Sequence, residues 1–286
     1  MTAPDRRAAA TEAPPAISLR GVCKTFADGA GAATEALRDV SLEIAEGMFV
    51  SLLGPSGCGK TTVLRILDGL LAPDSGRAQV FGAPPVPGPR TGFVFQSFRL
   101  IPWETVTGNV EFALASLPIG PRERAERARH YIDLVGLGRF ADAYPRQLSG
   151  GMRQRAALAR AMACEPRLLL MDEPFASLDA QTRELMQIEL MRLWSLRRTV
   201  VLFVTHSVDE ALFLSDRIVL MGPRPGRVVE TIEVPLPRPR WTYDVRAEPA
   251  FVGLRSHLAR RMQELVLNDP HSEFYGRDLG AVQSGA

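Results

Sequence analysis

The segment that most constrains the fold is a glycine-rich stretch between an apolar strand and a helix. An apolar run at Phe49–Leu53 leads into Gly54-Pro55-Ser56-Gly57-Cys58-Gly59-Lys60-Thr61, and a helical pattern runs from Lys60 to Leu71. This is the full G-x-x-x-x-G-K-(S/T) pattern in the strand-to-helix context that it requires. Glycines let the backbone wrap a phosphate, the lysine reaches its outer oxygens, and the threonine hydroxyl can ligate Mg²⁺. The stretch therefore predicts a phosphate loop, with a plain glycine-rich turn as the alternative.

The rest of the chain alternates apolar β-rich runs with helical patterns, which is typical of a three-layer α/β fold. The expected strands are 17–26, 36–44, 49–53, 77–81, 92–95, 168–171, 199–205, 217–221 and 228–234. The pattern is helical from 106 to about 163, and again at 179–195 and 251–267. We predict a mixed sheet with an N-terminal antiparallel β portion and a helical subdomain at about 97–165, all within a domain spanning 17–245. Residues 1–16 are expected to form a flexible tail, and 246–286 a C-terminal helix and tail.

The composition is that of a globular protein of a reducing compartment. Of the 286 residues, 46% are hydrophobic and 23% charged, and no apolar run approaches the roughly 18 residues that span a bilayer. The net charge of +2 is too small to indicate nucleic acid as a partner. The three cysteines, Cys23, Cys58 and Cys164, are scattered without metal-ligand spacing.

Two carboxylates, Asp172 and Glu173, follow the apolar run Leu168–Met171. Open α/β sheets bind ligands at the carboxyl ends of their strands, so we expect both acids to face a crevice. Asp172 is predicted to hold Mg²⁺, and Glu173 to act as the general base toward an attacking water. The alternative is a turn formed by Asp-Glu-Pro, which the presence of a phosphate loop disfavours.

Two further polar residues end strands, Gln96 after 92–95 and His206 after 199–205. The Gln96 amide is predicted to contact Mg²⁺ and water, and the His206 imidazole to contact a γ-phosphate or the water. Each residue taken alone is more often a structural polar group. Both functional assignments depend on the strand ends meeting at one edge of the sheet.

A second anion-binding terminus lies far downstream at Ser149-Gly150-Gly151. These residues open a helix expected to run to about Ala163, whose N-terminus carries free N–H groups and the positive end of the helix dipole. This terminus has no lysine of its own, so its own residues leave open which molecule carries the phosphate that it binds.

In order and approximate spacing, these motifs resemble the ATP-binding subunits of ABC transporters over Ile17 to Arg240. The resemblance implies a P-loop NTPase fold of the ABC type, with ATP and Mg²⁺ as cofactors and ATP hydrolysis as the activity. It implies catalytic roles for Lys60, Gln96, Glu173 and His206, and metal binding by Thr61, Gln96 and Asp172. The residues implied in nucleotide binding are Phe26, the whole phosphate loop 54–61, Thr62, Ser149, Gly150, Gly151 and Asp179.

Subunits of that family pair head-to-tail, so that the Ser-Gly-Gly helix of one caps the ATP on the phosphate loop of the other. Ser149 and the N–H groups of Gly150 and Gly151 are then expected to stabilise γ-phosphate charge in trans, and Asp179 to lie at the dimer seam. The family also stacks adenine on an aromatic residue ahead of the phosphate loop, at the place of Phe26. For Phe26 a strand-end core residue is the alternative.

Further details resemble the nitrate, sulfonate and taurine group of importers. They are Met152 after the glycines, Pro102-Trp103 after Gln96, Pro223-Arg224-Pro225-Gly226-Arg227, and Leu236-Pro237-Arg238-Pro239-Arg240. Such subunits work with membrane permease subunits and, indirectly, a periplasmic solute-binding protein, at the cytoplasmic face of the inner membrane. The expected permease contacts are Phe98, Leu100, Pro102, Trp103 and Val106, unless these side chains fill the core of the helical subdomain.

Two other functions are open alternatives. A non-transport ABC ATPase of DNA repair or translation commonly carries a long coiled coil, a zinc module or a second cassette, and the sequence contains none of these. A subunit that binds ATP without turnover is expected to have a damaged catalytic set, whereas here the set is complete. An importer of an unrelated solute is a third alternative, because the permease and the binding protein select the cargo.

Overall fold

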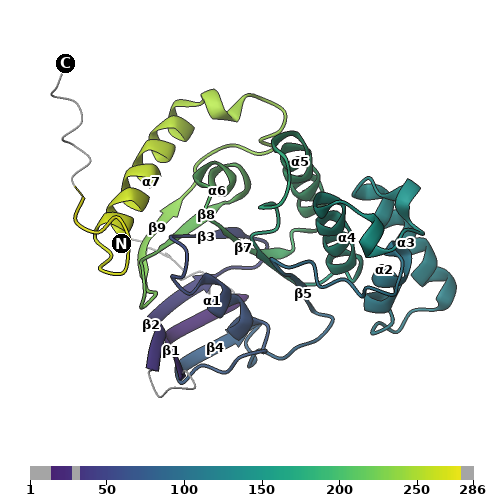
Figure 1. Ribbon diagram of the computed structural model, residues 1–286, viewed down its shortest axis with the longest axis horizontal. Coiled ribbons are helices and arrows are strands. Elements are labelled where there is room, and N and C mark those ends of the chain that lie inside the picture. The colour runs from purple at the N-terminus through teal and green to yellow at the C-terminus, as the bar shows by residue number, and fades with distance from the viewer. Residues whose placement is uncertain (1–13, 28–32, 278–286) are drawn as a thin grey trace, which may run out of the picture.

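The computed structural model describes residues 14–27 and 33–277, whose strands form two sheets (Figure 1). The antiparallel sheet has the order β2-β1-β4, with β1 (Ile17–Ala27), β2 (Ala33–Ile44) and β4 (Ser75–Val80). The larger sheet has the order β5-β6-β7-β3-β8-β9, with β3 (Phe49–Leu53), β5 (Thr91–Val94), β6 (Leu168–Asp172), β7 (Val200–Thr205), β8 (Arg217–Met221) and β9 (Val228–Glu233). Its neighbouring strands are parallel except for β8 and β9.

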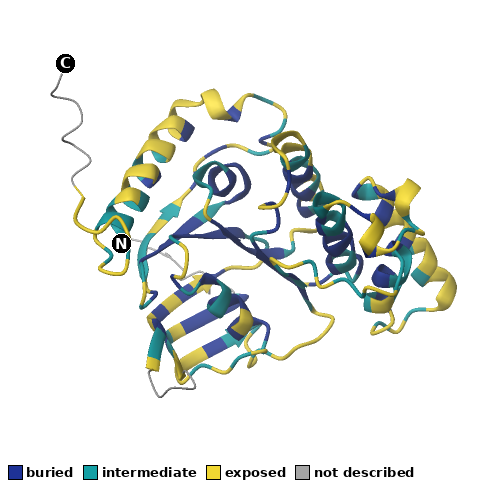
Figure 2. Ribbon diagram, in the orientation of Figure 1, coloured by how far each residue is buried: buried dark blue, intermediate teal, exposed yellow. Residues whose placement is uncertain are grey.

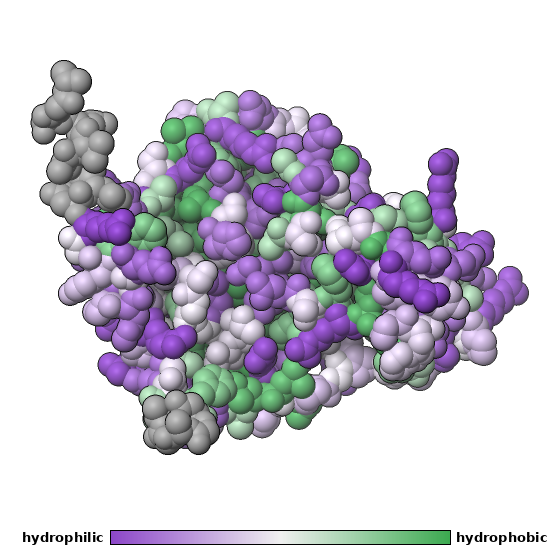
Figure 3. Space-filling model, viewed as in Figure 1, coloured by the Kyte–Doolittle hydropathy of each residue, from purple (hydrophilic) through white to green (hydrophobic). Residues whose placement is uncertain are grey.

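The α-helices are α1 (Lys60–Leu67), α2 (Val106–Leu114), α3 (Pro121–Leu134), α4 (Gly150–Ala163), α5 (Ala180–Arg197), α6 (Val208–Leu214) and α7 (Pro249–Leu267). Helices α2, α3 and α4 lie together at one end of the molecule and form the helical subdomain (Figure 1). The face of the molecule seen in Figure 3 is dominated by hydrophilic side chains, with apolar ones in small groups.

The central strands are buried on both faces, and their alternating side chains enter two cores. Phe49 and Leu53 of β3 belong to the core under α5, α6 and the helical subdomain. Val50 and Leu52 belong to the core shared with α1 and the antiparallel sheet. Figure 2 shows these strands dark blue along their length, between partly exposed helices. Burial on both faces explains why their sequences are continuous apolar runs rather than alternating ones.

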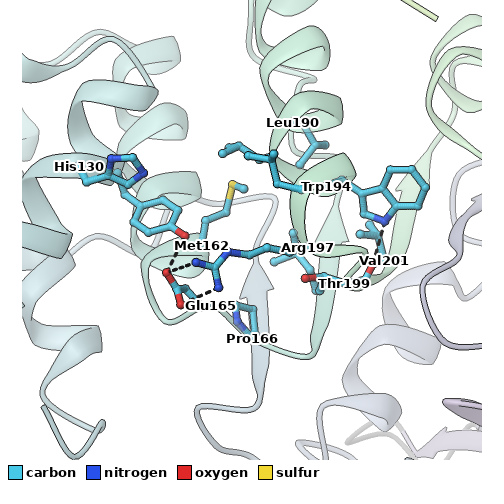
Figure 4. A pocket seen from close by; sticks show the side chains of 13 residues that line it. His130, Met162, Glu165, Pro166, Leu190, Trp194, Arg197, Thr199 and Val201 are labelled. Atoms are coloured by element: carbon cyan, nitrogen blue, oxygen red, sulfur yellow. Dashed lines mark hydrogen bonds and ion pairs between the residues drawn. The ribbon is translucent and has the colours of Figure 1, made fainter. Parts of the chain in front are cut away.

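The helical subdomain meets the larger sheet at an apolar cavity between α3, α4 and α5 (Figure 4). Glu165 joins the two sides at its edge, because it accepts hydrogen bonds from Arg197 Nη2 at 2.6 Å and from the Tyr131 hydroxyl at 3.2 Å. Burial, together with the nearby Glu165 carboxylate, raises the pKa of Tyr131 to about 12. None of the predicted site residues lines this cavity.

All the predicted strands are present, and their ends differ from the prediction by at most three residues. The helix expected over 60–71 ends at Leu67, because Gly69 adopts a left-handed φ of 76° that terminates it. Ala16, expected in the flexible tail, is buried, and its carbonyl oxygen accepts a hydrogen bond from Phe81 N at 2.7 Å. Residues 1–13 of the predicted tail lie outside the described residues, as do residues 28–32 between β1 and β2. None of the described helices has the length and apolar character needed to span a bilayer.

One arginine ties the segment that follows β9 to the core. Arg240 is 1% exposed, and its Nη1 donates hydrogen bonds to the carbonyl oxygens of Leu212, Phe213 and Ser215 at 2.8, 3.1 and 2.8 Å. Burial lowers the pKa of Arg240 to about 10, so the side chain stays charged at neutral pH. Because helix-end carbonyls have no partner within their own helix, Arg240 supplies donors that α6 lacks.

Replacing Arg240 by methionine is expected to lower the free energy of unfolding by about 3–5 kcal/mol, because it leaves buried carbonyls without their donors. The control is Arg246→Met, which removes an exposed ion pair with Glu184 at 2.7 Å and is expected to cost less than about 1 kcal/mol. Urea unfolding at pH 7 measures both. Equal losses for the two variants would contradict the structural role of Arg240.

Candidate functional site

The phosphate loop has a conformation that requires its glycines. Gly57 and Gly59 have φ values of 77° and 91°, a left-handed region in which a side chain is strained. A Cβ on Gly59 would lie 2.5 Å from Leu37 Cδ2, and one on Gly54 would lie 2.6 Å from the Met221 carbonyl oxygen. The loop is therefore held closely between β2 and the end of β8.

Lys60 is buried within the loop that precedes it. Its Nζ donates hydrogen bonds to the carbonyl oxygens of Gly54 and Pro55, each at 2.8 Å, and lies 3.6 Å from Cys58 Sγ. Burial raises the pKa of the Cys58 thiol, which therefore stays uncharged beside the lysine. No carboxylate is among the hydrogen-bond partners of Lys60, so an anionic ligand in the loop would meet its ammonium group directly.

Thr61 and Asp172 form a pair beside the loop. The Thr61 hydroxyl donates to Asp172 Oδ1 at 3.2 Å, and Asp172 is 4% exposed at the end of β6. Burial raises the pKa of Asp172, although the hydrogen bond from Thr61 opposes the shift. A cation beside this carboxylate would favour its charged form, and oxygen donors are the ligands that Mg²⁺ prefers, so the pair fits a magnesium ion. The described residues contain no cluster of three or more His, Cys, Asp or Glu side chains suited to a metal.

Three predicted catalytic residues converge at the ends of the neighbouring strands β5, β6 and β7. Gln96 Nε2 donates to Glu173 Oε2 at 3.2 Å, and His206 Nδ1 lies 3.6 Å from the same oxygen. Glu173 has a φ of 47°, which is uncommon for a residue with a side chain. Its N–H donates to the Val204 carbonyl at 3.0 Å, so the neighbouring strand holds this backbone in place.

A buried network that was not predicted supports the turn carrying His206. The Thr205 hydroxyl donates to Glu210 Oε2 at 2.6 Å and accepts a hydrogen bond from Ser207 N at 3.0 Å. Gln187 Nε2 also donates to Glu210, at 3.3 Å, and burial raises the pKa of Glu210. The signal in the sequence was Ser207-x-x-Glu210, the pattern of a helix capping box.

One groove joins the phosphate loop to the strand ends. Predicted site residues in its walls are Phe26, Ser56, Gly57, Gly59, Lys60, Thr61, Thr62, Gln96 and Glu173. Phe26 is 39% exposed, which argues against the alternative of a strand-end core residue. Arg224 also lines the groove. In the sequence, Arg224 indicated only a resemblance to an importer group and was not among the predicted site residues.

The predicted trans residues do not line this groove. Ser149 is exposed and caps α4, where its hydroxyl accepts an N–H from the first turn at 3.2 Å. Asp179 is exposed and caps α5 in the same way at 2.9 Å, and these hydrogen bonds lower its pKa. A Cβ on Gly151 would lie 3.0 Å from Leu178 Cδ2. The chain therefore brings the two helix N-termini close to each other rather than to its own phosphate loop.

The expected permease contacts divide into buried and exposed residues. Val106 is 1% exposed and belongs to the core, against which Leu100 also packs, so Val106 is excluded as a contact. Trp103 is 75% exposed, and Phe112 on α2 is also largely exposed. These two side chains are apolar surface that the helical subdomain does not bury.

Known proteins share this arrangement. Residues 37–176 match the sequence profile of the family described as ABC transporter. The chain is 51% identical over 238 residues to an uncharacterized ABC transporter ATP-binding protein of Methanocaldococcus jannaschii, a match covering 83% of this chain and 88% of that protein. It is 44% identical over 222 residues to a nitrate import ATP-binding protein of Synechocystis, covering 76% and 84%. A dimeric ATP-binding cassette solved in a post-hydrolysis state with ADP and Pi superposes with a TM-score of 0.70 at 34% identity, covering 76% of this chain and 98% of that one.

Proposed function

The chain belongs to the ABC transporter family, as an ATP-binding subunit of the nitrate-importer group, and we propose that it powers import of a small anion or organosulfur solute. Membership confirms the predicted fold class and the ATPase activity. The observation that carries the mechanism is the convergence of Lys60, Gln96 and Glu173 on one groove at the carboxyl ends of parallel strands. Permease subunits hold the chain at the cytoplasmic face of the inner membrane.

ATP lies along the groove, with adenine against the exposed ring of Phe26 and phosphates on the loop. The left-handed glycines allow the loop backbone to wrap the phosphates, and Lys60 adds a positive charge. Thr61, Asp172 and Gln96 would hold Mg²⁺, which would supply positive charge beside the phosphates. The buried Thr61–Asp172 pair supports this assignment.

Glu173 is the general base. Its carboxylate accepts a proton from the water that attacks the γ-phosphorus, and the bond between this phosphorus and the bridging oxygen breaks to give ADP and phosphate. The amide of Gln96 donates to Glu173 Oε2 and so orients the carboxylate. His206, 3.6 Å from the same oxygen, contacts the γ-phosphate or the water from the other side.

The variant Glu173→Gln is expected to bind ATP with nearly unchanged affinity and to lose hydrolysis by about 10²–10⁴-fold, because the amide cannot accept the proton of water. An ATP-bound dimer should accumulate, which size-exclusion chromatography with ATP and Mg²⁺ would detect. Phosphate release under single-turnover conditions measures the chemical step. Hydrolysis at the wild-type rate would remove Glu173 from this role.

We also propose that Ser149, Gly150 and Gly151 act on the ATP of a second copy of this chain. The proposal is supported by the exposure of Ser149, by the absence of all three residues from the lining of their own groove, and by the dimeric state of the 34% identical cassette structure. In a two-fold, head-to-tail pair each exposed α4 terminus meets the partner's phosphate loop, which makes two equivalent sites. Asp179, beside this terminus, then lies at the seam.

Mixing Ser149→Arg with Lys60→Ala subunits tests this composite site. Each variant alone is expected to be inactive, whereas each mixed dimer retains one site whose loop and cap are both intact. Random pairing should restore about a quarter of wild-type ATPase activity if the two sites act independently. Two affinity tags, purified in sequence, verify that mixed dimers form. Mixed dimers no more active than the parents would contradict a site shared between subunits.

The exposed apolar residues Trp103 and Phe112 are the proposed contact with the permease. Large exposed apolar side chains are a common mark of partner surfaces. Trp103 follows Gln96 by seven residues, so a contact there lies close along the chain to a residue that orients Glu173. The periplasmic binding protein acts on this subunit only through the permease.

Trp103→Ala is expected to reduce co-purification with the permease subunits and to slow ATP-driven uptake by about 10-fold or more, as truncation of an aromatic contact residue commonly does. The ATPase activity of the isolated chain should not change. The matched control is Leu196→Ala, which truncates another highly exposed apolar side chain on α5. Unchanged permease binding in Trp103→Ala would reject this surface.

Mass spectrometry of the solute retained by the co-purified binding protein would identify the cargo.

A further inference from the structure

Arg224 lies in the turn between β8 and β9 and forms part of the wall of the nucleotide groove. Its Nη2 is 3.5 Å from the position that a Cβ on Gly57 would occupy, so the guanidinium group lies against the phosphate loop. Among the described residues that line the groove, Lys60 and Arg224 are the only two cationic side chains. The groove therefore has a second positive charge on a segment far from the phosphate loop in sequence.

The turn that carries Arg224 is fixed against the phosphate loop. Gly226 N donates to the Ala36 carbonyl at 2.9 Å, and the Gly226 carbonyl accepts from Arg38 N at 2.9 Å. A Cβ on Gly226 would lie only 2.0 Å from the Cys58 carbonyl oxygen, so the two backbones are in direct contact. The prolines on either side of Arg224 restrict φ at both positions. The Arg224 Cα is therefore held beside the loop.

No carboxylate of the described residues forms an ion pair with Arg224, which is exposed. Glu35 and Asp269 line the polar cavity on the other side of Arg224. Glu35 pairs with Arg38, and Asp269 accepts a hydrogen bond from His271 N at 2.9 Å. The guanidinium group is thus available to an anionic ligand in the groove.

We propose that Arg224 is a nucleotide-binding residue whose guanidinium group donates hydrogen bonds to phosphate oxygens of ATP on the phosphate loop. The proposal rests on ATP binding at this loop. Lys60 approaches from inside the loop, where it is bonded to Gly54 and Pro55, whereas Arg224 approaches beside Gly57. The planar fork of N–H donors of an arginine matches phosphate oxygens better than a second ammonium group does.

The position of Arg224 favours a phosphate as its ligand over an acidic side chain of a second subunit. It shares the groove with Lys60, Thr61 and Thr62 of its own chain. A ligand bound along these residues therefore meets the guanidinium group before any partner closes over the site. Contact between Arg224 and a second subunit is the competing outcome of the test.

The test uses the full chain, with ATP, ADP and inorganic tripolyphosphate as ligands in calorimetric or competition titrations. Arg224→Ala is expected to weaken the binding of all three by about 10-fold, the loss expected for one hydrogen bond between charged groups. Arg224→Lys should recover part of this loss, because it keeps the charge without the fork. Tripolyphosphate carries no base or ribose, so a loss for ATP but not for tripolyphosphate would overturn the phosphate contact.

The matched control is Arg227→Ala, which removes an exposed arginine of the same turn that does not line the groove. It should bind all three ligands like the wild type, and both alanine variants should unfold at the wild-type temperature without nucleotide. Unchanged ATP affinity in Arg224→Ala overturns the proposal. So does unchanged affinity combined with weaker dimerisation in the Glu173→Gln background, which would assign Arg224 to the subunit interface. Failure of the wild type to bind ATP would instead refute the proposed function itself.

Discussion

The parallel register of β5, β6, β7 and β3 is the constraint on which the site depends. Leu53 pairs with Thr205 in this register, so the strands finish at one edge of the sheet. The connection after each strand then delivers one functional element: the phosphate loop after β3, and Gln96, Glu173 and His206 after the other three. Because both faces of these strands are buried, a slip by one residue would exchange the side chains of the two cores and displace the converging groups.

Adjacent carboxylates acquire different properties because the backbone turns between them. Asp172 is still in β6, and its buried carboxylate faces the Thr61 hydroxyl. Glu173 adopts a left-handed conformation held by the Val204 carbonyl, and its carboxylate reaches Gln96 and His206. The position of Asp172 suits a cation, and the position of Glu173 suits proton transfer. Phosphoryl transfer to water requires this separation of roles.

Most of the fold and the core of the site were predictable, because apolar runs buried on both faces and the residues that end them are local features of the sequence. The phosphate loop and Glu173 belong to this class. The sequence left the role of Val106 open between a partner contact and the core, because an apolar residue in a helix has the same pattern in both cases. Arg224 was missed because its place depends on Gly226 packing against Cys58, a contact between segments far apart in the chain.

In the proposed head-to-tail pair, each chain would link the cap on its partner's ATP to the general base for its own ATP. The close approach of Gly151 to Leu178 joins the N-terminus of α4 to the turn that ends at Asp179 and leads into α5. That turn follows Glu173 by only a few residues, so the cap offered to the partner's ATP and the base for the chain's own ATP share one short segment. In the proposed pair, a movement of the cap that followed loss of the partner's γ-phosphate would therefore reach the segment that carries Glu173 through the contact of Gly151 with Leu178.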